Sequence, residues 1–395
     1  MEEKIMDYNN IFNFKNPVKH FININHLAFP TAPNLIDIES TCWTKPFKFR
    51  IQKESNSFRT LKIPNIIALT CAYEHLKTLP HFNDPQQLDI NHKRLSARLN
   101  TGDFAVGEYD IHLGNDFNAL CVYDNLIKLD IKEFYGRIYT HYLDFNGLTD
   151  RYITNMNFGA TNGLIMGNYL SLYFAEQYLV KISQEIETSL SEQSIDCEYT
   201  YFSDDFYFFC NKNDNNKIIQ IFDSILDKFD LDRNSTKFEL WDYEKFNSYN
   251  VIARYWKKLI AHCNTHYSND SEHNKLAFIN QIIYRISQLN DDKQKRVFIN
   301  NFFKTKYFRT LNLEKFIVKD YDYHQLCHIF RTSPELLLYC IDKFSRMTNF
   351  EKNIVHKFFK IRYGESLKTS YHDVQLYFFY AIQLLEFNDI LCDFK

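Results

Sequence analysis

Glycine and proline are scarce in this chain and unevenly placed. The 395 residues include 9 glycines and 8 prolines; eight of the glycines lie between Gly102 and Gly167, and seven of the prolines precede residue 86. From about residue 250 onward, apolar residues recur at helical spacing in segments such as "KLAFINQIIYRISQL" and "PELLLYCIDKFSRM". This pattern predicts an all-helical C-terminal domain over residues 249–395. A HEAT-like solenoid is one form that such a domain can take, although no fixed sequence period singles it out.

The chain also lacks paired cysteines and long apolar runs. Its nine cysteines include no CxxC pair, and the first residues, "MEEKIMDYNN", show no secretory signal pattern. An odd number of cysteines without such a segment is typical of reduced thiols in the cytoplasm. The longest apolar stretch, "VQLYFFYAIQLLEF", has about 14 residues, whereas a membrane-spanning helix needs about 20. We therefore expect a cytoplasmic protein with no membrane partner.

The chain has no overall excess of positive charge. The formal net charge is −3, so no overall basic field indicates a nucleic-acid partner. One local segment differs, because "TKPFKFRIQKESNSFRTLKIPN" sets six basic residues against the single acid Glu54: Lys45, Lys48, Arg50, Lys53, Arg59 and Lys62. Basic residues interleaved with aromatic ones suit a phosphate backbone. A solvated surface loop explains the same composition, and the sequence leaves both interpretations open.

The middle of the chain shows a mixed pattern. "NLIKLDIKEFYGRIYTHYL" predicts a strand ending near Asp130 and then a helix, and "TNGLIMGNYLSLYFAEQYLVKISQEI" predicts a loop followed by a long helix. "EYTYFSDDFYFFC" predicts a β-hairpin, and "KIIQIFDSILDKFDLDRN" an amphipathic helix. The order of these elements indicates an α+β fold in which helices back an antiparallel sheet.

Two adjacent aspartates, Asp204 and Asp205, interrupt the aromatic run "TYFSDDFYFF". Neighbouring side chains in a strand point to opposite faces, so the pair is best placed at a hairpin tip. A solvated acidic turn explains the pair by itself. However, Asp130 ends an apolar strand about seventy residues upstream. If the strands are neighbours, the carboxylates converge, and such carboxylates can bind two Mg²⁺ ions, or Mn²⁺ in their place.

Four segments, in this order along the chain, favour a metal site over a solvated acidic turn: "LDIKEFYGRI", "GLIMGNYLSLYFAEQYL", "YFSDD" and "LDRNSTKF". Together they resemble the four successive palm motifs of reverse transcriptases, over roughly residues 55–245. Their details and the helical C-terminal region are most similar to the bacterial abortive-infection, or defence-associated, reverse transcriptases. The resemblance implies an N-terminal fingers region over residues 1–110 and a palm with a polymerase active site over residues 111–248.

The resemblance also implies roles for the acidic residues and for a lysine. Asp130 would be the first metal ligand, assisted by the carbonyl oxygen of Ile131. Asp204 would be the second metal ligand, and Asp205 its less essential neighbour. Lys237, in "NSTK", would lie near the leaving pyrophosphate, where it can act as a general acid.

Further residues would bind the incoming nucleotide. Tyr135 corresponds to the family's steric gate, which packs under the sugar and excludes a 2′-hydroxyl; a core aromatic is the alternative. Gly163 and Gly167 would let the backbone approach the nucleotide, and Asn168 would form a hydrogen bond near it. Arg94 and Arg98, which share a face if "HKRLSARLN" is helical, would contact the triphosphate.

Two positions depart from the family pattern. Ile165-Met166 stands where conventional members have Pro-Gln, and Phe202 replaces the tyrosine that usually opens the Asp-Asp box. Both changes remove polar groups near the nucleotide. These changes therefore argue against ordinary, faithful copying of a template. They are compatible with synthesis of one particular product, such as a homopolymer or a short repeat.

We therefore expect a Mg²⁺-dependent DNA polymerase of the reverse-transcriptase class, acting in antiphage defence. It would add dNTPs to a nucleic-acid or protein primer, either templated by a bound RNA or untemplated, and it would assemble into oligomers through its helical domain. One alternative is a catalytically silent palm that serves as a nucleic-acid-binding scaffold. The cluster of like charges disfavours it, because such a cluster is energetically unfavourable and a scaffold does not require one. Another is a terminal transferase that uses NTPs, which Tyr135 disfavours.

Overall fold

The structure is a computed structural model that describes residues 7–12, 21, 23–26, 43–54, 57–104, 107–144, 150–250, 279, 282–304, 320–348 and 350–394. The chain forms two compact units. The first comprises Met1–Lys48 and Leu61–Asn250, and the second comprises Phe49–Thr60 and Val251–Lys395. No helix among the described residues is both long and apolar enough to cross a lipid bilayer.

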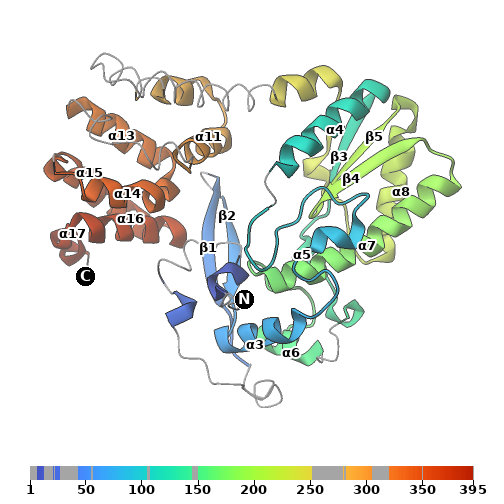
Figure 1. Ribbon diagram of the computed structural model, residues 1–395, viewed down its shortest axis with the longest axis horizontal. Helices are drawn as coiled ribbons and strands as arrows, with labels where there is room; N and C mark the ends of the chain where they lie inside the picture. The colour runs from blue at the N-terminus through green and yellow to red at the C-terminus, as the bar shows by residue number, and fades with distance from the viewer. Residues whose placement is uncertain are drawn as a thin grey trace, which may run out of the picture. The chain divides into compact units, whose positions relative to one another are not determined.

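The first unit contains a four-stranded antiparallel sheet of spatial order β4-β5-β3-β6 (Figure 1). Its strands are β3 (Asn125–Asp130), β4 (Cys197–Phe202), β5 (Asp205–Cys210) and β6 (Glu239–Trp241). β4 and β5 form the predicted hairpin, and β3 pairs with β5 in the centre of the sheet. An α+β fold with an antiparallel sheet backed by helices is therefore confirmed.

Alternating aromatic side chains explain why the hairpin forms and stays in register. Phe206 and Phe208 are almost fully buried on one face of β5, and both contact the ring of Phe222. Phe222 belongs to α8 (Asn215–Lys228), which packs along the long helix α7 (Tyr169–Glu192). These two helices therefore cover one face of the sheet (Figure 1).

The other face of the sheet is covered by α4 (Glu108–Val122). Leu113, Ala119 and Leu120 of this helix join a buried cluster with Phe209 of β5 and Trp241 of β6. The sheet is thus enclosed by helices on both faces, which holds its strand ends in place. The described part of this unit also contains η1 (Tyr8–Ile11), η2 (Ile24–His26), α3 (Ile66–Leu76), η3 (Pro85–Asp89), α5 (Phe134–Arg137), η4 (Thr140–Tyr142), α6 (Asp150–Met156), η5 (Lys212–Asp214) and η6 (Ser235–Lys237).

The helix expected after Asp130 is much shorter than predicted. It consists of the single turn α5, after which Ile138 has an extended backbone. The reason is pairing with a distant segment: the carbonyl oxygen of Ile138 accepts a hydrogen bond from Gly163 N at 2.9 Å, and Tyr139 forms an antiparallel bridge with Asn162. Tertiary hydrogen bonds therefore override the local helical pattern here.

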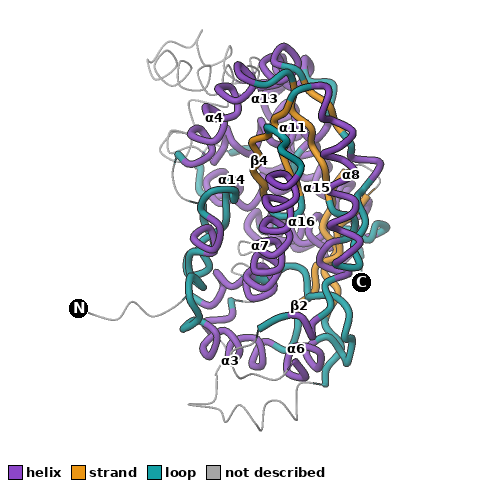
Figure 2. Tube along the Cα trace, turned by 90° about the vertical axis from the view of Figure 1, so that its right-hand side faces the viewer, coloured by secondary structure: helices purple, strands orange, loops and turns teal. Residues whose placement is uncertain are grey.

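The second unit is dominated by helices, as the scarcity of breakers predicted. Among the described residues they include α11 (Asp292–Lys304), α13 (Asp320–Thr332), η8 (Pro334–Leu336), α14 (Leu337–Ser345), α15 (Lys352–Leu367), α16 (His372–Leu385) and α17 (Asn388–Asp393). α16 packs against both α14 and α15, and α13 packs against α15 (Figures 1 and 2). Phe359 of α15 lies between Phe330 of α13 and Phe378 of α16, with ring centroids 6.4 and 6.2 Å away.

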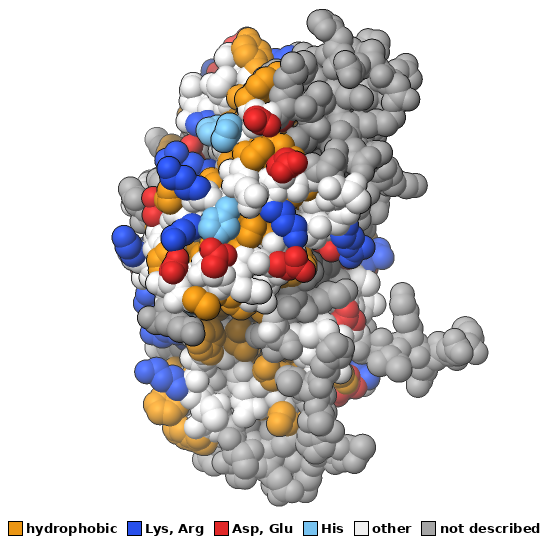
Figure 3. All heavy atoms as spheres, turned by 90° about the vertical axis from the view of Figure 1, so that its left-hand side faces the viewer, with side chains coloured by type: hydrophobic (Ala, Val, Ile, Leu, Met, Phe, Trp, Pro, Cys, Tyr) orange, Lys and Arg blue, Asp and Glu red, His pale blue; other side chains and the backbone are white. Residues whose placement is uncertain are grey.

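One outer face of this unit carries opposite charges side by side. Three residues of α15 form ion pairs with the C-terminal segment: Lys352 with Glu386, His356 with Asp389, and Lys360 with Asp393. Figure 3 shows basic, acidic and histidine side chains intermixed over the described part of this face. A mixed surface of this kind does not suit a polyanion, so we place no nucleic-acid contact there.

A two-stranded sheet of β1 (Phe47–Glu54) and β2 (Ser57–Ile63) carries the basic segment. Within the second unit, its backbone contacts the start of α16. Gln52 N donates to both carboxylate oxygens of Asp373 at 3.2 Å, and Arg50 N donates to His372 Nδ1 at 3.2 Å. Burial raises the pKa of Asp373 to about 6, against the opposing effect of hydrogen bonds from the backbone of Val374, Gln52 and Asp373 itself.

This carboxylate makes the second unit less stable as the pH rises. Asp373 holds its proton to a higher pH in the folded state than in the unfolded state. Its contribution to the free energy of unfolding is therefore largest at and below about pH 4, and it falls as the pH rises to about 6. The loss is of order 3 kcal/mol. Urea unfolding followed by circular dichroism should show this fall in the wild type and a flatter profile in Asp373→Asn. The control Glu386→Gln, at a mostly exposed side chain, should keep the wild-type profile; an unchanged profile in Asp373→Asn would contradict the assignment.

Candidate active site

Three carboxylates meet where β3 ends and β5 begins. Asp130 is the last residue of β3 and Asp205 the first of β5, and the register of the sheet places the two directly opposite each other. Asp204 occupies the two-residue turn between β4 and β5, where Ser203 has a positive φ of 52°. The carbonyl oxygen of Asp204 accepts a hydrogen bond from Ile131 N at 3.0 Å. The convergence predicted from the sequence is therefore what the structure shows.

The site buries Asp130 and leaves Asp204 and Asp205 only partly exposed to water. Asp130 is only 2% exposed. Burial, followed by the negative charge of Asp130, raises the pKa of Asp204. Burial and the charge of Asp204 raise the pKa of Asp205 to about 6. Like charges held together in a poorly solvated place favour either protonation or the arrival of a cation.

A cation from the chain already contacts the cluster. Lys237 lies in η6, and its ammonium forms an ion pair with Asp130 Oδ2. Burial by itself would lower the pKa of Lys237, but its hydrogen bond and charge interaction with Asp130 outweigh this and raise it. The other oxygen, Asp130 Oδ1, accepts a hydrogen bond from Asn234 Nδ2 at 2.8 Å. Asn234 was not singled out from the sequence, although it stands within the same "LDRNSTKF" segment.

The loop that carries Lys237 is fixed to the end of β3 by backbone hydrogen bonds. Asn234 N donates to the carbonyl oxygen of Asp130 at 2.7 Å, and Lys132 N donates to that of Asp232 at 2.9 Å. Neither bond uses the carbonyl oxygen of Ile131, the predicted backbone ligand. Asp232 also forms an ion pair with Arg137 of α5 at 2.5 Å. The position of Lys237 relative to Asp130 is thus built into the fold.

The donor set fits a divalent cation chemically. Carboxylate oxygens are the ligands that Mg²⁺ and Mn²⁺ prefer, and the raised pKa values of Asp204 and Asp205 reflect charge that a bound cation would offset. Among the described residues, however, no group of three or more His, Cys, Asp or Glu side chains stands in a preformed metal-binding arrangement. Since the ammonium of Lys237 contacts Asp130, a metal at this carboxylate would require that ion pair to open.

The glycine-marked loop lies against the segment that follows Asp130. Leu164 N donates to the carbonyl oxygen of Tyr135 at 2.7 Å. Gly163 has a φ of +88°, and a Cβ there would come within 2.9 Å of the carbonyl oxygen of Gly136. The chain's own backbone therefore requires a glycine at this position, and the predicted approach to a nucleotide stays a prediction. Tyr135 is partly exposed, which disfavours the alternative of a core aromatic.

Gly167 and Asn168 lie at the start of α7. Gly167 has a φ of 115°, a conformation that suits glycine. The buried side chain of Asn168 caps the helix, because its Oδ1 accepts from Ser171 N at 2.9 Å and its Nδ2 donates to the carbonyl oxygen of Ile165 at 2.8 Å. The structure thus gives Asn168 a helix-capping role, and its predicted nucleotide contact stays a prediction.

The two predicted phosphate-binding arginines differ from expectation. Residues 93–98 are not helical, so the expected shared helix face of Arg94 and Arg98 is wrong. Arg94 is buried, forms an ion pair with Asp116 of α4, and lies 4.4 Å from the ring centroid of Tyr207. Its guanidinium therefore has a structural partner instead of a free face for phosphate. Arg98 is exposed, and its predicted role stays a prediction.

The basic residues of the N-terminal segment lie on or beside β1 and β2. In the first unit, Lys62 donates from Nζ to Asn157 Oδ1 at 2.9 Å, and its backbone N donates to the carbonyl oxygen of Met166 at 2.9 Å. Burial and the nearby charge of Lys48 lower the pKa of Lys62. In the second unit, the guanidinium of Arg50 lies 4.9 Å from the ring centroid of Phe58. Lys48, Arg50 and Lys62 are thus part of two paired strands rather than of a loop, and the phosphate-binding interpretation stays a prediction.

Comparisons with known proteins do not establish a family. No protein-family model matches the chain, and no curated protein matches it. Among solved structures, one similar chain is that of telomerase from Candida albicans in complex with a fragment of telomeric RNA, with 12% sequence identity and a TM-score of 0.36. The similarity covers 82% of this chain and 64% of the telomerase chain. Similarity at this level does not demonstrate a shared fold.

Proposed function

We propose that this protein is a divalent-metal-dependent nucleotidyltransferase of the reverse-transcriptase class that adds dNTPs to a primer. The observation that carries the proposal is the convergence of Asp130 with Asp204 and Asp205 on paired strands of an antiparallel sheet. The resemblance of four sequence segments to palm motifs supports it, since three of them supply Asp130, the Asp204–Asp205 pair and Lys237, and the remaining one contacts the segment after Asp130. A role in antiphage defence, and an RNA template or no template, belong to the same proposal.

The carboxylates of Asp130, Asp204 and Asp205, with the carbonyl oxygen of Ile131, would hold Mg²⁺ or Mn²⁺. When bound, the metal supplies activation of the attacking hydroxyl and charge stabilisation at the leaving oxygen. The chain's own contribution is to position these oxygens rigidly, because β3 and β5 are buried and hydrogen-bonded to each other.

Lys237 is suited to the leaving group. Its pKa is raised by Asp130, so it carries a proton at neutral pH. Release from Asp130 would leave a charged donor beside the site, able to neutralise and protonate a departing pyrophosphate. Tyr135, partly exposed beside the glycine-marked loop, is suited to contact the sugar of the incoming nucleotide.

Replacing Lys237 by glutamine should lower the rate of incorporation by about 100- to 10,000-fold, the range expected for loss of a general acid. The same change removes the charge that lowers the pKa of Asp204 and of Asp205, so the loss should be greater at pH 6 than at pH 8. Incorporation of labelled dNTP at both pH values measures this. Lys217→Gln, at an exposed lysine paired with Asp214, should behave as the wild type; equal rates for Lys237→Gln and the wild type would contradict the role.

Two alternatives to this function make different experimental predictions. A catalytically silent scaffold would bind nucleic acid without incorporating any nucleotide. An NTP-using terminal transferase would prefer NTPs to dNTPs, which a partly exposed aromatic ring at position 135 disfavours.

The test of the proposal is incubation of the purified protein with Mg²⁺ and each dNTP, singly and together, with and without RNase pretreatment. We expect metal-dependent incorporation that EDTA abolishes. Extension with a single dNTP that survives RNase would indicate untemplated synthesis, and loss after RNase would indicate a bound RNA template. Sequencing the product and testing it for covalently attached protein identifies the primer. Absence of incorporation in every arm, with Mg²⁺ or Mn²⁺, would contradict the proposal.

A further inference from the structure

A short extended segment adds to the edge of the sheet directly before the acidic turn. Tyr201 N donates to the carbonyl oxygen of His92 at 2.8 Å, and Arg94 N donates to that of Tyr201 at 2.8 Å. Lys93 thereby forms a parallel bridge with Tyr201. Tyr201 lies three positions before Asp204 in the chain, so this segment holds the last residues of β4 that lead into the turn.

Lys93 forms a fully buried ion pair with α7. Its Nζ lies 2.6 Å from Glu176 Oε2, and the two side chains are 0% and 2% exposed. The same ammonium donates to the carbonyl oxygen of Pro85 at 3.2 Å and lies 5.7 Å from the ring centroid of Tyr201. The pair therefore connects the edge segment, the helix α7 and the end of β4.

Arg94 forms a second buried ion pair on the opposite face. Neighbouring side chains of an extended segment point to opposite sides, and Arg94 accordingly contacts Asp116 of α4. Its Nη1 also lies 3.5 Å from Thr200 Oγ1 of β4. The two consecutive basic residues thus fix one short segment to the helices on both faces of the sheet.

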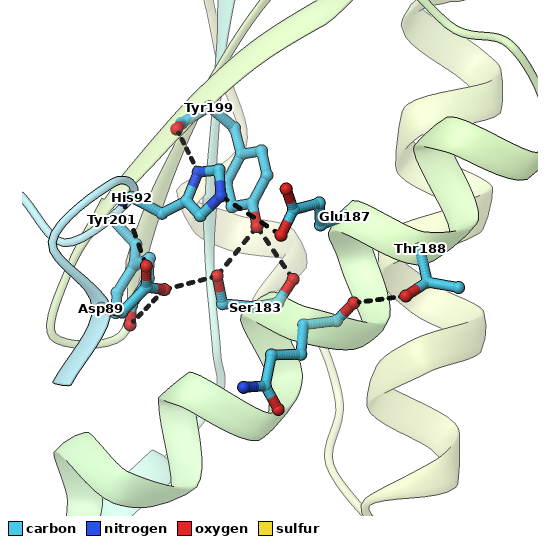
Figure 4. A network of polar contacts seen from close by, with 8 residues as sticks. Asp89, His92, Ser183, Glu187, Thr188, Tyr199 and Tyr201 are labelled. Atoms are coloured by element: carbon cyan, nitrogen blue, oxygen red, sulfur yellow. Dashed lines mark hydrogen bonds and ion pairs between the residues drawn. The ribbon is translucent and has the colours of Figure 1, made fainter.

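A network of hydroxyl groups anchors β4 on the α7 side (Figure 4). Tyr201 OH donates to Asp89 Oδ2 at 3.1 Å, and Ser183 Oγ of α7 donates to the same oxygen at 2.7 Å. Tyr199 OH donates to the carbonyl oxygen of Ser183 at 2.8 Å. Figure 4 shows Tyr199 pointing from β4 toward Ser183 and Tyr201 pointing toward Asp89. The carbonyl oxygen of Asp89 in turn accepts from Lys93 N at 2.9 Å, which joins this network to the ion pair.

Buried ion pairs are a poor way to gain stability. Removing two charges from water is expensive, and well-packed apolar side chains of similar size often stabilise a fold as well or better. What an ion pair adds is a defined geometry between its two partners. Burial raises the pKa of Glu176 and Lys93 lowers it, while the charge of Asp204 acts on the same carboxyl. Glu176 is therefore within electrostatic reach of the acidic turn.

We propose that Lys93 and Glu176 are positioning residues that hold the Asp204 turn in place for the proposed reaction. The effect on catalysis rests on the proposed function. The anchoring of the turn rests only on the contacts of Lys93 and Glu176 described above. Arg94, with its partner Asp116, supports the same segment from the other face. Neither Lys93 nor Glu176 is exposed enough to touch a substrate.

The double variant Lys93→Met with Glu176→Leu separates positioning from stability. Its apolar side chains can pack in the vacated space, so we expect a thermal midpoint close to that of the wild type. Hydrogen–deuterium exchange of the peptide covering residues 200–206 should nevertheless become about 10-fold faster. The kcat for dNTP incorporation should fall about 10- to 100-fold, as for a small misplacement of catalytic groups, with little change in KM.

The conservative variant Glu176→Gln retains an acceptor for Lys93, whose buried amine can lose its proton once the counter-charge is gone, and it should keep both exchange protection and kcat within a few-fold of the wild type. The control Lys228→Gln with Glu185→Gln removes an exposed ion pair between α8 and α7 and should change neither readout. If the double variant does not fold, Lys93→Met, in which Glu176 can take up a proton, gives the same comparison.

Wild-type exchange at residues 200–206 in a folded double variant would overturn the positioning role, whatever the activity. Faster exchange at the turn with unchanged kcat would overturn its link to catalysis. Absence of incorporation in the wild type would refute the proposed function instead, and the exchange measurement would still decide whether the ion pair anchors the turn.

Discussion

Replacing Asp204 by asparagine should lower dNTP incorporation about 1,000-fold or more. Asparagine keeps the size of the side chain and its place in the β4–β5 turn, but it removes a charged oxygen ligand from a site in which charge stabilisation supplies several kcal/mol. Because burial and Asp130 already disfavour the ionised form of Asp204, the same substitution should leave the thermal midpoint unchanged or raise it. Incorporation of labelled dNTP and a thermal melt of the same preparation measure both effects.

A comparison with Asp205→Asn sharpens this test. Asp205 is the first residue of β5 and lies opposite Asp130, and the resemblance assigns it the less essential role. We expect a smaller loss of activity for Asp205→Asn than for Asp204→Asn. Wild-type activity in Asp204→Asn would refute the assignment of the acidic cluster as the reaction centre.

Replacing Tyr135 by alanine should increase the use of NTPs relative to dNTPs by about 10- to 200-fold, the range over which a single steric contact discriminates between substrates. The ring lies in α5, four residues after Ile131, and its backbone is fixed by the hydrogen bond from Leu164. Removing it should open space for a 2′-hydroxyl without moving the carboxylates.

The selectivity is measured by competition between one dNTP and the matching NTP. The product is digested, and the ratio of ribonucleotides to deoxyribonucleotides in it is determined. Tyr142→Ala is the matched control, since this tyrosine is 56% exposed in the neighbouring η4 turn, and it should keep the wild-type ratio. A wild type that already prefers NTPs, or an unchanged ratio in Tyr135→Ala, would favour the terminal-transferase alternative.

The features that could be predicted from the sequence are those set by local patterns. Alternating aromatic residues on both sides of Ser203 and Asp204 predicted the hairpin, and the structure has it with Phe206 and Phe208 buried. The convergence with Asp130 was also predicted, because a strand end and a hairpin tip meet when their strands pair.

The features that could not be predicted depend on partners that are distant in the sequence. Lys93 and Glu176 are separated by more than eighty positions, and nothing local to either indicates a buried ion pair. The resemblance assigned Arg94 to the triphosphate, whereas Asp116 pairs with it in the interior, where basic side chains are rarely found. The helix predicted after Asp130 was shortened for the same kind of reason, since the segment pairs with the glycine-marked loop.

The most direct test of the central claim is anomalous diffraction from crystals of the protein soaked with Mn²⁺ and a non-hydrolysable dNTP. We predict two anomalous peaks about 3.5–4 Å apart, in contact with the carboxylates of Asp130 and Asp204, and with the ammonium of Lys237 moved away from Asp130. Nucleotide density without any peak at these carboxylates, and with the Lys237–Asp130 ion pair intact, would contradict the account.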